Sequence, residues 1–149
     1  MPTKQPKIGT KAHKELKYKQ QIDVLNDIVR FRIGASDIHG VGVIAMRDIK
    51  KGTVLEMDSI PHQFDLPFKK FPKLERDVQD ILLGHFPLIV EGSHFMYPVT
   101  KFQAYLNHSD KPNYDAIKDK TLKNIKAGEE ITEDYRKIKG YKKIFPWLV

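Results

Sequence analysis

The sequence of 149 residues predicts a β-rich fold with one inserted helix. Short runs of β-branched and aromatic residues recur along the chain, and turn-forming residues separate them about every 8–12 residues. Only residues 71–86 space their apolar side chains with the period of a helix. The length indicates one domain, or one domain plus an appendage, and the pattern alone goes no further than a β-rich class.

Composition excludes several classes of protein. Hydrophobic residues make up 40% of the chain and charged residues 30%, as in globular proteins. There is no cysteine, which excludes disulfides and cysteine-based zinc sites. No segment approaches the ~20 apolar residues of a membrane span, and the charged N-terminus has no apolar signal core. We therefore expect a cytoplasmic protein, or one in the host nucleus if the source is a virus or an intracellular bacterium.

Residues 1–24 are expected to form a flexible, lysine-rich tail. Within residues 1–21, six lysines face the single Glu15, a net charge of +5, so that +2 of the total of +7 is left for the rest of the chain. The tail is either a solvated arm or an electrostatic guide toward nucleic acid or an acidic partner surface. The remainder of the chain is too weakly basic to indicate nucleic-acid binding.

The first half of the chain is expected to hold three strands. Residues 21–30 are either a short helix or the lead into the first strand at 31–33. The turn-rich link GASDIHG joins this strand to the second, at 41–45. After the turn at 50–52, residues 53–60 alternate roughly between apolar and polar side chains and predict a third strand.

The segment FPKLERDVQDILLGHF predicts the inserted helix. Pro72 suits a helix start and Gly84 suits a helix end. The apolar face of this helix is expected to comprise Leu74, Val78, Ile81, Leu82 and His85. Its expected role is packing.

The second half predicts, in order, a strand at 94–99, one helical turn at 101–106, two short strands at 113–117 and 121–125 around a turn at 118–120, and a last strand at 130–135. Pro98 limits the first of these to a sheet edge or a strand end. The chain closes with Phe145, Trp147 and Leu148, and such an apolar end is expected to fold onto the body.

Three motifs could carry chemistry. In HGVG, residues 39–42, the glycines permit either a close approach to a ligand or a tight turn, but the dinucleotide fingerprint is absent. NHS, residues 107–109, could be a glycan acceptor, a polar turn or part of a ligand site. GEEITEDY, residues 128–135, could be an amphipathic strand with a half-buried tyrosine. The six histidines lack close ligand spacing, so no metal site is expected.

Taken together, these motifs resemble the SET domain of protein lysine methyltransferases, in particular the compact SET proteins of bacteria and viruses. The resemblance covers about residues 31–135 and rests on IGASDIHGVGVIAMRDIKKGTVLE, YLNHSDKPN and IKAGEEITEDY. It implies several small curved sheets and a knot-like crossing made by the second and third motifs. The implied organisation is a SET domain at 25–139 and a short aromatic segment at 140–149 that closes the site.

The resemblance also implies an activity and a set of site residues. Members of the family transfer a methyl group from S-adenosylmethionine to a lysine amine and release S-adenosylhomocysteine. Tyr135 and Tyr105 are the implied catalytic residues, and Tyr97, Tyr105 and Phe145 the implied walls of the lysine channel, with Tyr141 a further aromatic candidate. The residues expected to bind the cofactor are His39, Gly40, Val41, Gly42, Asn107, His108, Tyr135 and Trp147.

The chain departs from the family pattern in two places. Without cysteine it lacks the zinc-bound closing segment of many eukaryotic members, so the segment with Phe145, Pro146 and Trp147 is expected either to close the site or simply to pack on the core. Glu133 stands where many relatives carry an aromatic or a small polar residue.

The implied partner is a protein that presents a lysine, such as a histone or another basic protein. We expect no membrane contact, and the chain could be a monomer or a dimer. The alternatives are a SET-like module that binds a partner without catalysis, and a nucleic-acid-associated protein that uses the lysine-rich tail.

Overall fold

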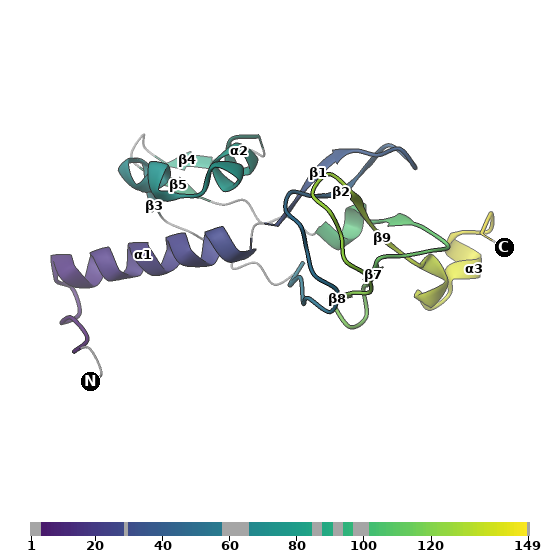
Figure 1. Cartoon of the computed structure of the whole chain (residues 1–149), viewed down its shortest axis with the longest axis horizontal. Helices are drawn as coiled ribbons and strands as arrows, with labels where there is room; N and C mark the ends of the chain where they lie inside the picture. Colours follow the sequence, from purple (N-terminus) through teal and green to yellow (C-terminus); the bar gives the residue numbers. More distant parts are fainter. Residues whose placement is uncertain are drawn as a thin grey trace. The chain divides into compact units, whose positions relative to one another are not determined.

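The computed structural model describes residues 4–28, 30–57, 66–84, 88–90, 94–96 and 102–148. The chain divides into two compact units (Figure 1). The first, here called the helical unit, comprises Met1–Val29 and Pro61–Val99, and the second, the sheet unit, comprises Arg30–Ile60 and Thr100–Val149. The predicted β-rich architecture of small separate sheets with an inserted helix is confirmed.

The main sheet of the sheet unit has the order β1-β2-β9-β6. Strands β1 (Phe31–Ala35) and β2 (Val41–Ala45) form an antiparallel hairpin around the predicted turn-rich link, and β9 (Glu130–Glu133) pairs with the other edge of β2. Figure 1 shows β9, near the end of the chain, beside β2, near its start. The sheet therefore joins sequence segments that lie far apart.

Strand β6 (Asn107–His108) runs parallel to β9. In this register Asn107 lies opposite Thr132, and His108 lies opposite Glu133. The pairing continues past the strand, where the Ser109 N–H donates to the carbonyl of Glu133 over 2.9 Å. The second and third sequence motifs are thus held side by side by backbone hydrogen bonds.

A second, two-stranded sheet forms from β7 (Tyr114–Asp115) and β8 (Lys120–Thr121). Both strands are shorter than predicted, and the turn between them covers 116–119, because Lys120 pairs with Asp115 in the sheet. The predicted helical turn is the 3₁₀-helix η2 (Phe102–Tyr105), whose Phe102 ring meets the Phe31 ring edge-on at 4.7 Å. The core of this unit is apolar and fully enclosed. It contains Phe31, Val43, Ala45, Ile49, Leu55, Met57, Phe102, Leu106, Tyr114, Ile125 and Ile131.

The helical unit holds α1 (Lys11–Ile28), the 3₁₀-helix η1 (Phe68–Lys73), α2 (Arg76–Gly84) and the strands β3 (Leu66–Pro67), β4 (Leu88–Val90) and β5 (His94–Met96). The strands form a sheet of order β3-β5-β4. The buried apolar residues of the helical unit come from both of its chain segments. They are Ile22, Leu25, Leu66, Leu74 and Val78. None of the helices in the described residues is long and apolar enough to cross a membrane.

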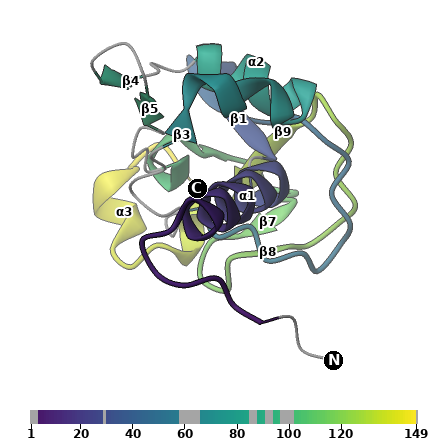
Figure 2. The same ribbon diagram turned by 90° about the vertical axis from the view of Figure 1, so that its left-hand side faces the viewer.

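The prediction of a flexible tail at residues 1–24 is wrong from residue 11 onward. Residues 11–24 belong to α1, which Figures 1 and 2 both draw as a helix. The Thr10 hydroxyl caps its first turn by accepting from the His13 N–H. Lysine, glutamate and glutamine are good helix formers, so the lysine-rich composition does not exclude a helix. Burial of Ile22 and Leu25 and an ion pair between Glu15 and Lys70 anchor it.

Two other expectations need correction. The α-helix begins at Arg76 rather than Pro72, because Pro72 lies inside η1, a 3₁₀-helix that ends at Lys73. Residues 53–57 form no regular strand, since only Val54 makes an isolated bridge, to Lys120, and Glu56 has a positive φ of 55°. Tyr97 and Pro98 lie outside the described residues.

Candidate functional site

A cavity of about 560 Å³ opens in the sheet unit and is here called the His108 cavity. Its walls come from four parts of the chain, namely the β1–β2 link, β6, the segment directly after β9 and the C-terminal segment. The residues that line it are Ile38, His39, Asn107, His108, Tyr135 and Trp147. Five of these six were expected from the sequence to belong to one site, and the fold brings them together.

The side-chain amide of Asn107 holds the β1–β2 link. Its Nδ2 lies 2.9 Å from the carbonyl oxygen of Val41 and 3.2 Å from that of His39. It also lies 2.9 Å from Oε2 of Glu130 and 3.0 Å from Oγ of Ser36. Since an amide has only two N–H groups, these four acceptors share them. Asn107 is therefore a buried clamp as well as a wall of the cavity.

Ser36 and Glu130 complete this clamp. Both lie in stretches noted in the sequence, GASDIHG and GEEITEDY, but neither was given a role there. The Ser36 hydroxyl donates to Oε1 of Glu130 over 2.6 Å and accepts from the N–H groups of Ile38 and His39. The only sequence signal is the Ser-Asp pair in the link, which is typical of a turn that bonds its own backbone. The carboxylate partner lies 94 residues further on, beyond any local pattern.

The two glycines of the HGVG motif serve different purposes. A Cβ on Gly42 would lie 2.6 Å from Oε2 of Glu130, so this glycine makes room for the carboxylate of the clamp. Gly40 has nothing within 4 Å of a Cβ position, and its φ of +52° favours glycine for conformational reasons. Its carbonyl accepts from the Ser36 N–H and so closes the link.

His108 connects β6 to the segment that follows β9. Its Nδ1 accepts from the Tyr135 N–H over 3.1 Å, so this nitrogen carries no proton. Its Nε2 then carries the proton and donates to Asp110, 3.2 Å away. Asp110 therefore fixes the tautomer of the histidine, and it also lies 3.4 Å from the Arg136 guanidinium.

Tyr135 begins the 3₁₀-helix η3 (Tyr135–Lys137) and borders the His108 cavity. Its hydroxyl donates to the carbonyl of Leu106 over 2.5 Å, and its ring stacks on Phe145 at 4.5 Å. Burial, with a further contribution from the nearby carboxylates of Glu133 and Glu130, raises the pKa of this hydroxyl. Tyr135 therefore keeps its proton and acts as a neutral, oriented hydrogen-bonding group.

The C-terminal segment contributes aromatic rings. After the short helix α3 (Tyr141–Ile144), Phe145 is half-buried against Tyr135, and Trp147 stands 6.5 Å from His108 with 63% of its surface exposed. Trp147 thus forms an open edge of the cavity. Tyr105 is 42% exposed and is not among the residues that line the cavity, so its assigned role stays a prediction.

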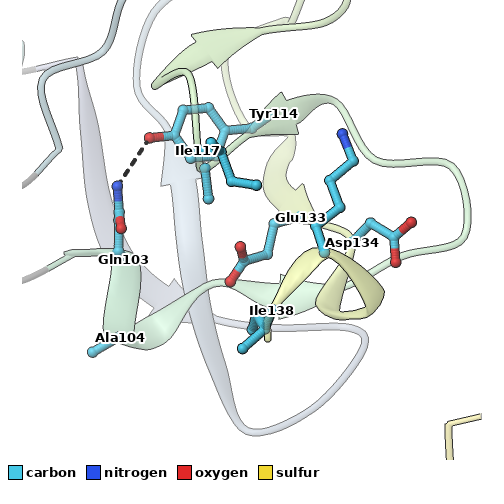
Figure 3. Close-up of a pocket in the computed structure, with 9 residues that line it drawn as sticks. Gln103, Ala104, Tyr114, Ile117, Glu133, Asp134 and Ile138 are labelled. Carbon is cyan, nitrogen blue, oxygen red and sulfur yellow. Dashed lines mark hydrogen bonds between the residues drawn. The ribbon is translucent and has the colours of Figure 1, made fainter. Parts of the chain in front are cut away.

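A second cavity of about 420 Å³, here called the Glu133 cavity, lies elsewhere in the sheet unit. Figure 3 shows the Glu133 carboxylate pointing into it, while that of Asp134 points away. Burial, and secondarily the charge of Asp134, raises the pKa of Glu133 to about 7. The residues that line it are Gln103, Ala104, Tyr114, Ala116, Ile117, Glu133, Asp134, Lys137 and Ile138.

Replacing Glu133 with glutamine is expected to raise the free energy of unfolding by about 1–2 kcal/mol at about pH 8 and to leave it unchanged at about pH 4. The pKa is about 7 in the folded chain and 4.5 for an unperturbed glutamate, so the folded chain binds the extra proton. In the parent protein, the stability that this proton contributes is fully present below pH 4.5 and is lost as the pH rises through about 7. Urea denaturation at both pH values measures the difference, and a variant that is less stable than the parent at the higher pH would contradict it.

Within the described part of the chain, no group of three or more histidine or acidic side chains could hold a metal ion.

A family model for the SET domain matches residues 40–136, more than half of the chain. The crystal structure of a candidate histone methyltransferase from Plasmodium falciparum is 22% identical, with 71% of this chain and 92% of that chain covered at a TM-score of 0.36. That score is too low to support any argument about the site. No curated protein matches the chain.

Proposed function

The chain belongs to the SET-domain family of protein methyltransferases, and we propose that it transfers a methyl group from S-adenosylmethionine to the side-chain amine of a lysine in a protein. The observation that carries this proposal is the convergence of His39, Asn107, His108 and Trp147 on one cavity, with Tyr135 at its border. We further propose that the protein acts in the cytoplasm, or in the nucleus of a host cell.

The His108 cavity fits S-adenosylmethionine in size and chemistry. Its volume of about 560 Å³ lies within the range of roughly 300–1,000 Å³ that is typical of ligand pockets. The exposed Trp147 indole offers a flat apolar face for a purine ring, and the neutral His108 adds no positive charge beside a sulfonium. When bound, the sulfonium supplies a methyl group that is already activated for transfer.

The chain's own residues would position the attacking amine. The clamp of Asn107, Ser36 and Glu130 fixes the link that carries His39, so one wall of the cavity is preorganised. The Tyr135 hydroxyl is held by the Leu106 carbonyl, and both groups can orient an amine that carries N–H groups and a lone pair. Orientation of this kind can contribute several kcal/mol, up to about 7–11 in favourable cases.

Binding of the cofactor tests the proposal directly. S-adenosylmethionine and S-adenosylhomocysteine are expected to raise the melting temperature of the full chain, because each binds only the folded state. Trp147→Ala should weaken binding, since it removes the open aromatic edge of the cavity. Ile144→Ala is the matched control, because Ile144 is exposed in the same segment but does not line the cavity. A parent protein whose melting temperature is unchanged by either ligand would overturn the assignment.

A further inference from the structure

The net positive charge of the chain lies mainly in the sheet unit. That unit carries 16 lysine and arginine residues against 11 aspartate and glutamate residues, a net charge of +5. The helical unit carries 10 against 8, a net charge of +2, because its own acidic residues offset the lysine-rich N-terminus. The charge that could attract an anionic partner therefore belongs mostly to the sheet unit.

Two distant segments of the sheet unit pair antiparallel on its surface. Isolated bridges join Ile49 to Ile125 and Val54 to Lys120. Figure 1 shows the first of these segments beside β8, the strand that contains Lys120. Ile49 and Ile125 are buried, and the residues on either side of each are exposed, because successive side chains of an extended segment point in opposite directions.

Five lysines gather on the solvent side of this pairing. The Lys51 N–H donates to the Asn124 side chain over 2.8 Å, so the turn at 50–52 lies against the segment that carries Lys123. The Lys123 ammonium in turn lies 3.5 Å from the carbonyl oxygen of Lys111. The cluster, here called the lysine surface, consists of exposed residues. They are Lys50, Lys51, Lys111, Lys120 and Lys123.

Acidic side chains do not neutralise the lysine surface. Among the described residues, no aspartate or glutamate forms an ion pair with any of its five members. Two nearby carboxylates are hydrogen-bonded to other groups, since Asp48 accepts from the Ala127 N–H, and Asp119 accepts from the Glu56 N–H and the Tyr114 hydroxyl. Like charges in such a cluster repel one another, and an anionic partner relieves this repulsion.

The composition of the lysine surface favours phosphate groups as its ligands. Every cation in it is a lysine, which binds phosphate as a point charge, whereas the planar fork that matches a carboxylate belongs to arginine. Residues 47–54 and 111–126 contain one aromatic residue, Tyr114, which is 1% exposed. The surface thus offers no ring on which the bases of a single strand could stack. It suits a double helix, whose bases are already stacked.

We propose that the lysine surface binds the phosphate backbone of double-stranded nucleic acid without reading its sequence. Contacts to phosphate position a protein on a duplex but carry no sequence information. Binding of this kind is weak and sensitive to salt, with a Kd of about 10⁻⁶–10⁻⁴ M near physiological salt. Its consequence for catalysis rests on the proposed function: the protein would be concentrated on nucleic acid, where basic proteins that present lysines also bind.

The first experiment measures binding of the full chain to a fluorescent DNA duplex of mixed sequence by anisotropy. If three to five lysines neutralise phosphates, the logarithm of the binding constant is expected to fall with the logarithm of the salt concentration with a slope of roughly −3 to −4.5. The affinity should then drop about 10²-fold between about 50 and 200 mM salt. No binding at the lower salt concentration, or an affinity that salt does not change, would overturn the proposal.

The second experiment compares two variants with the same change of charge. The combined substitution Lys50→Gln, Lys120→Gln and Lys123→Gln is expected to weaken duplex binding about tenfold or more at low salt and to make the slope less steep by about 0.9 for each lysine removed. The control combines Lys11→Gln, Lys14→Gln and Lys17→Gln, three exposed positions of α1, and should stay within about twofold of the parent. A larger loss in the control would place the interaction on α1 and contradict the proposal.

Competition identifies the class of partner. Unlabelled DNA and RNA duplexes are expected to displace the labelled duplex, whereas a poly-glutamate peptide of equal total charge should do so only at a concentration about tenfold higher or more. Equally effective poly-glutamate would indicate an acidic protein instead, and tighter binding of single-stranded DNA would rule out the duplex. The assays contain neither cofactor nor peptide substrate, so their failure leaves the proposed methyl transfer untouched, and a protein without methyl transfer can still pass them.

Discussion

Tyr135→Phe is expected to lower the rate of methyl transfer by about 10²–10³-fold while leaving S-adenosylmethionine binding within about twofold of the parent. The hydroxyl is fixed by the Leu106 carbonyl at the border of the His108 cavity, and it keeps its proton because burial raises its pKa. Removing it takes away an oriented polar group that contacts the reacting amine in the proposed mechanism. The ring remains and continues to stack on Phe145.

Transfer of a radiolabelled methyl group to a pool of synthetic lysine-containing peptides measures this effect, and calorimetry measures cofactor binding. Tyr18→Phe is the matched control, because Tyr18 lies in α1 and lines neither cavity. It is expected to retain most of the parental rate. A loss of rate in Tyr18→Phe as large as that in Tyr135→Phe would contradict the role assigned to Tyr135.

Asn107→Ala is expected to lower the free energy of unfolding by about 2–4 kcal/mol and to weaken cofactor binding. The substitution removes the donor shared by the carbonyls of His39 and Val41 and by the carboxylate of Glu130. Since Asn107 is only 8% exposed, water cannot readily replace that donor. The link that carries His39 then loses its clamp, so the preorganised wall of the cavity is lost together with the stability.

The chain has a single tryptophan, Trp147, whose fluorescence during urea denaturation reports on the sheet unit. Asn124→Ala is the control, because the Asn124 side chain accepts one hydrogen bond, from the Lys51 N–H, on the exposed surface. Asn124→Ala is expected to lower the free energy of unfolding by less than about 1 kcal/mol. If Asn107→Ala and Asn124→Ala lowered the free energy of unfolding equally, the clamp would contribute little to the stability of the sheet unit.

Local patterns predicted the sheet unit well. Short apolar runs separated by turn residues correctly indicated the β1–β2 hairpin, because a hairpin depends on neighbouring residues. They also indicated the β7–β8 pair and β9, but with longer strands than the structure has. The three motifs also indicated which residues would meet at the His108 cavity. That inference came from family resemblance, since no local rule pairs β6 with β9, more than twenty residues later along the chain.

Other features depended on distant contacts or on composition that local rules misread. The bond from Ser36 to Glu130 spans 94 residues and has no periodic signal. Residues 11–24 resemble a flexible arm in charge, yet they form part of α1 because buried Ile22 and Leu25 and the pair with Lys70 stabilise the helix. Pro72, a typical first helical residue, lies instead within the 3₁₀-helix that precedes α2.

The most direct test of the central claim is the identity of the atom that receives the methyl group. The parent protein and Tyr135→Phe are incubated with S-adenosylmethionine that carries a deuterated methyl group and with the lysine peptide pool, and the products are sequenced by tandem mass spectrometry. The proposed function predicts deuterated methyl groups on lysine Nζ with the parent and very few with Tyr135→Phe. Labelling that is absent from lysine although the cofactor binds, or that is equal in the two proteins, would contradict it.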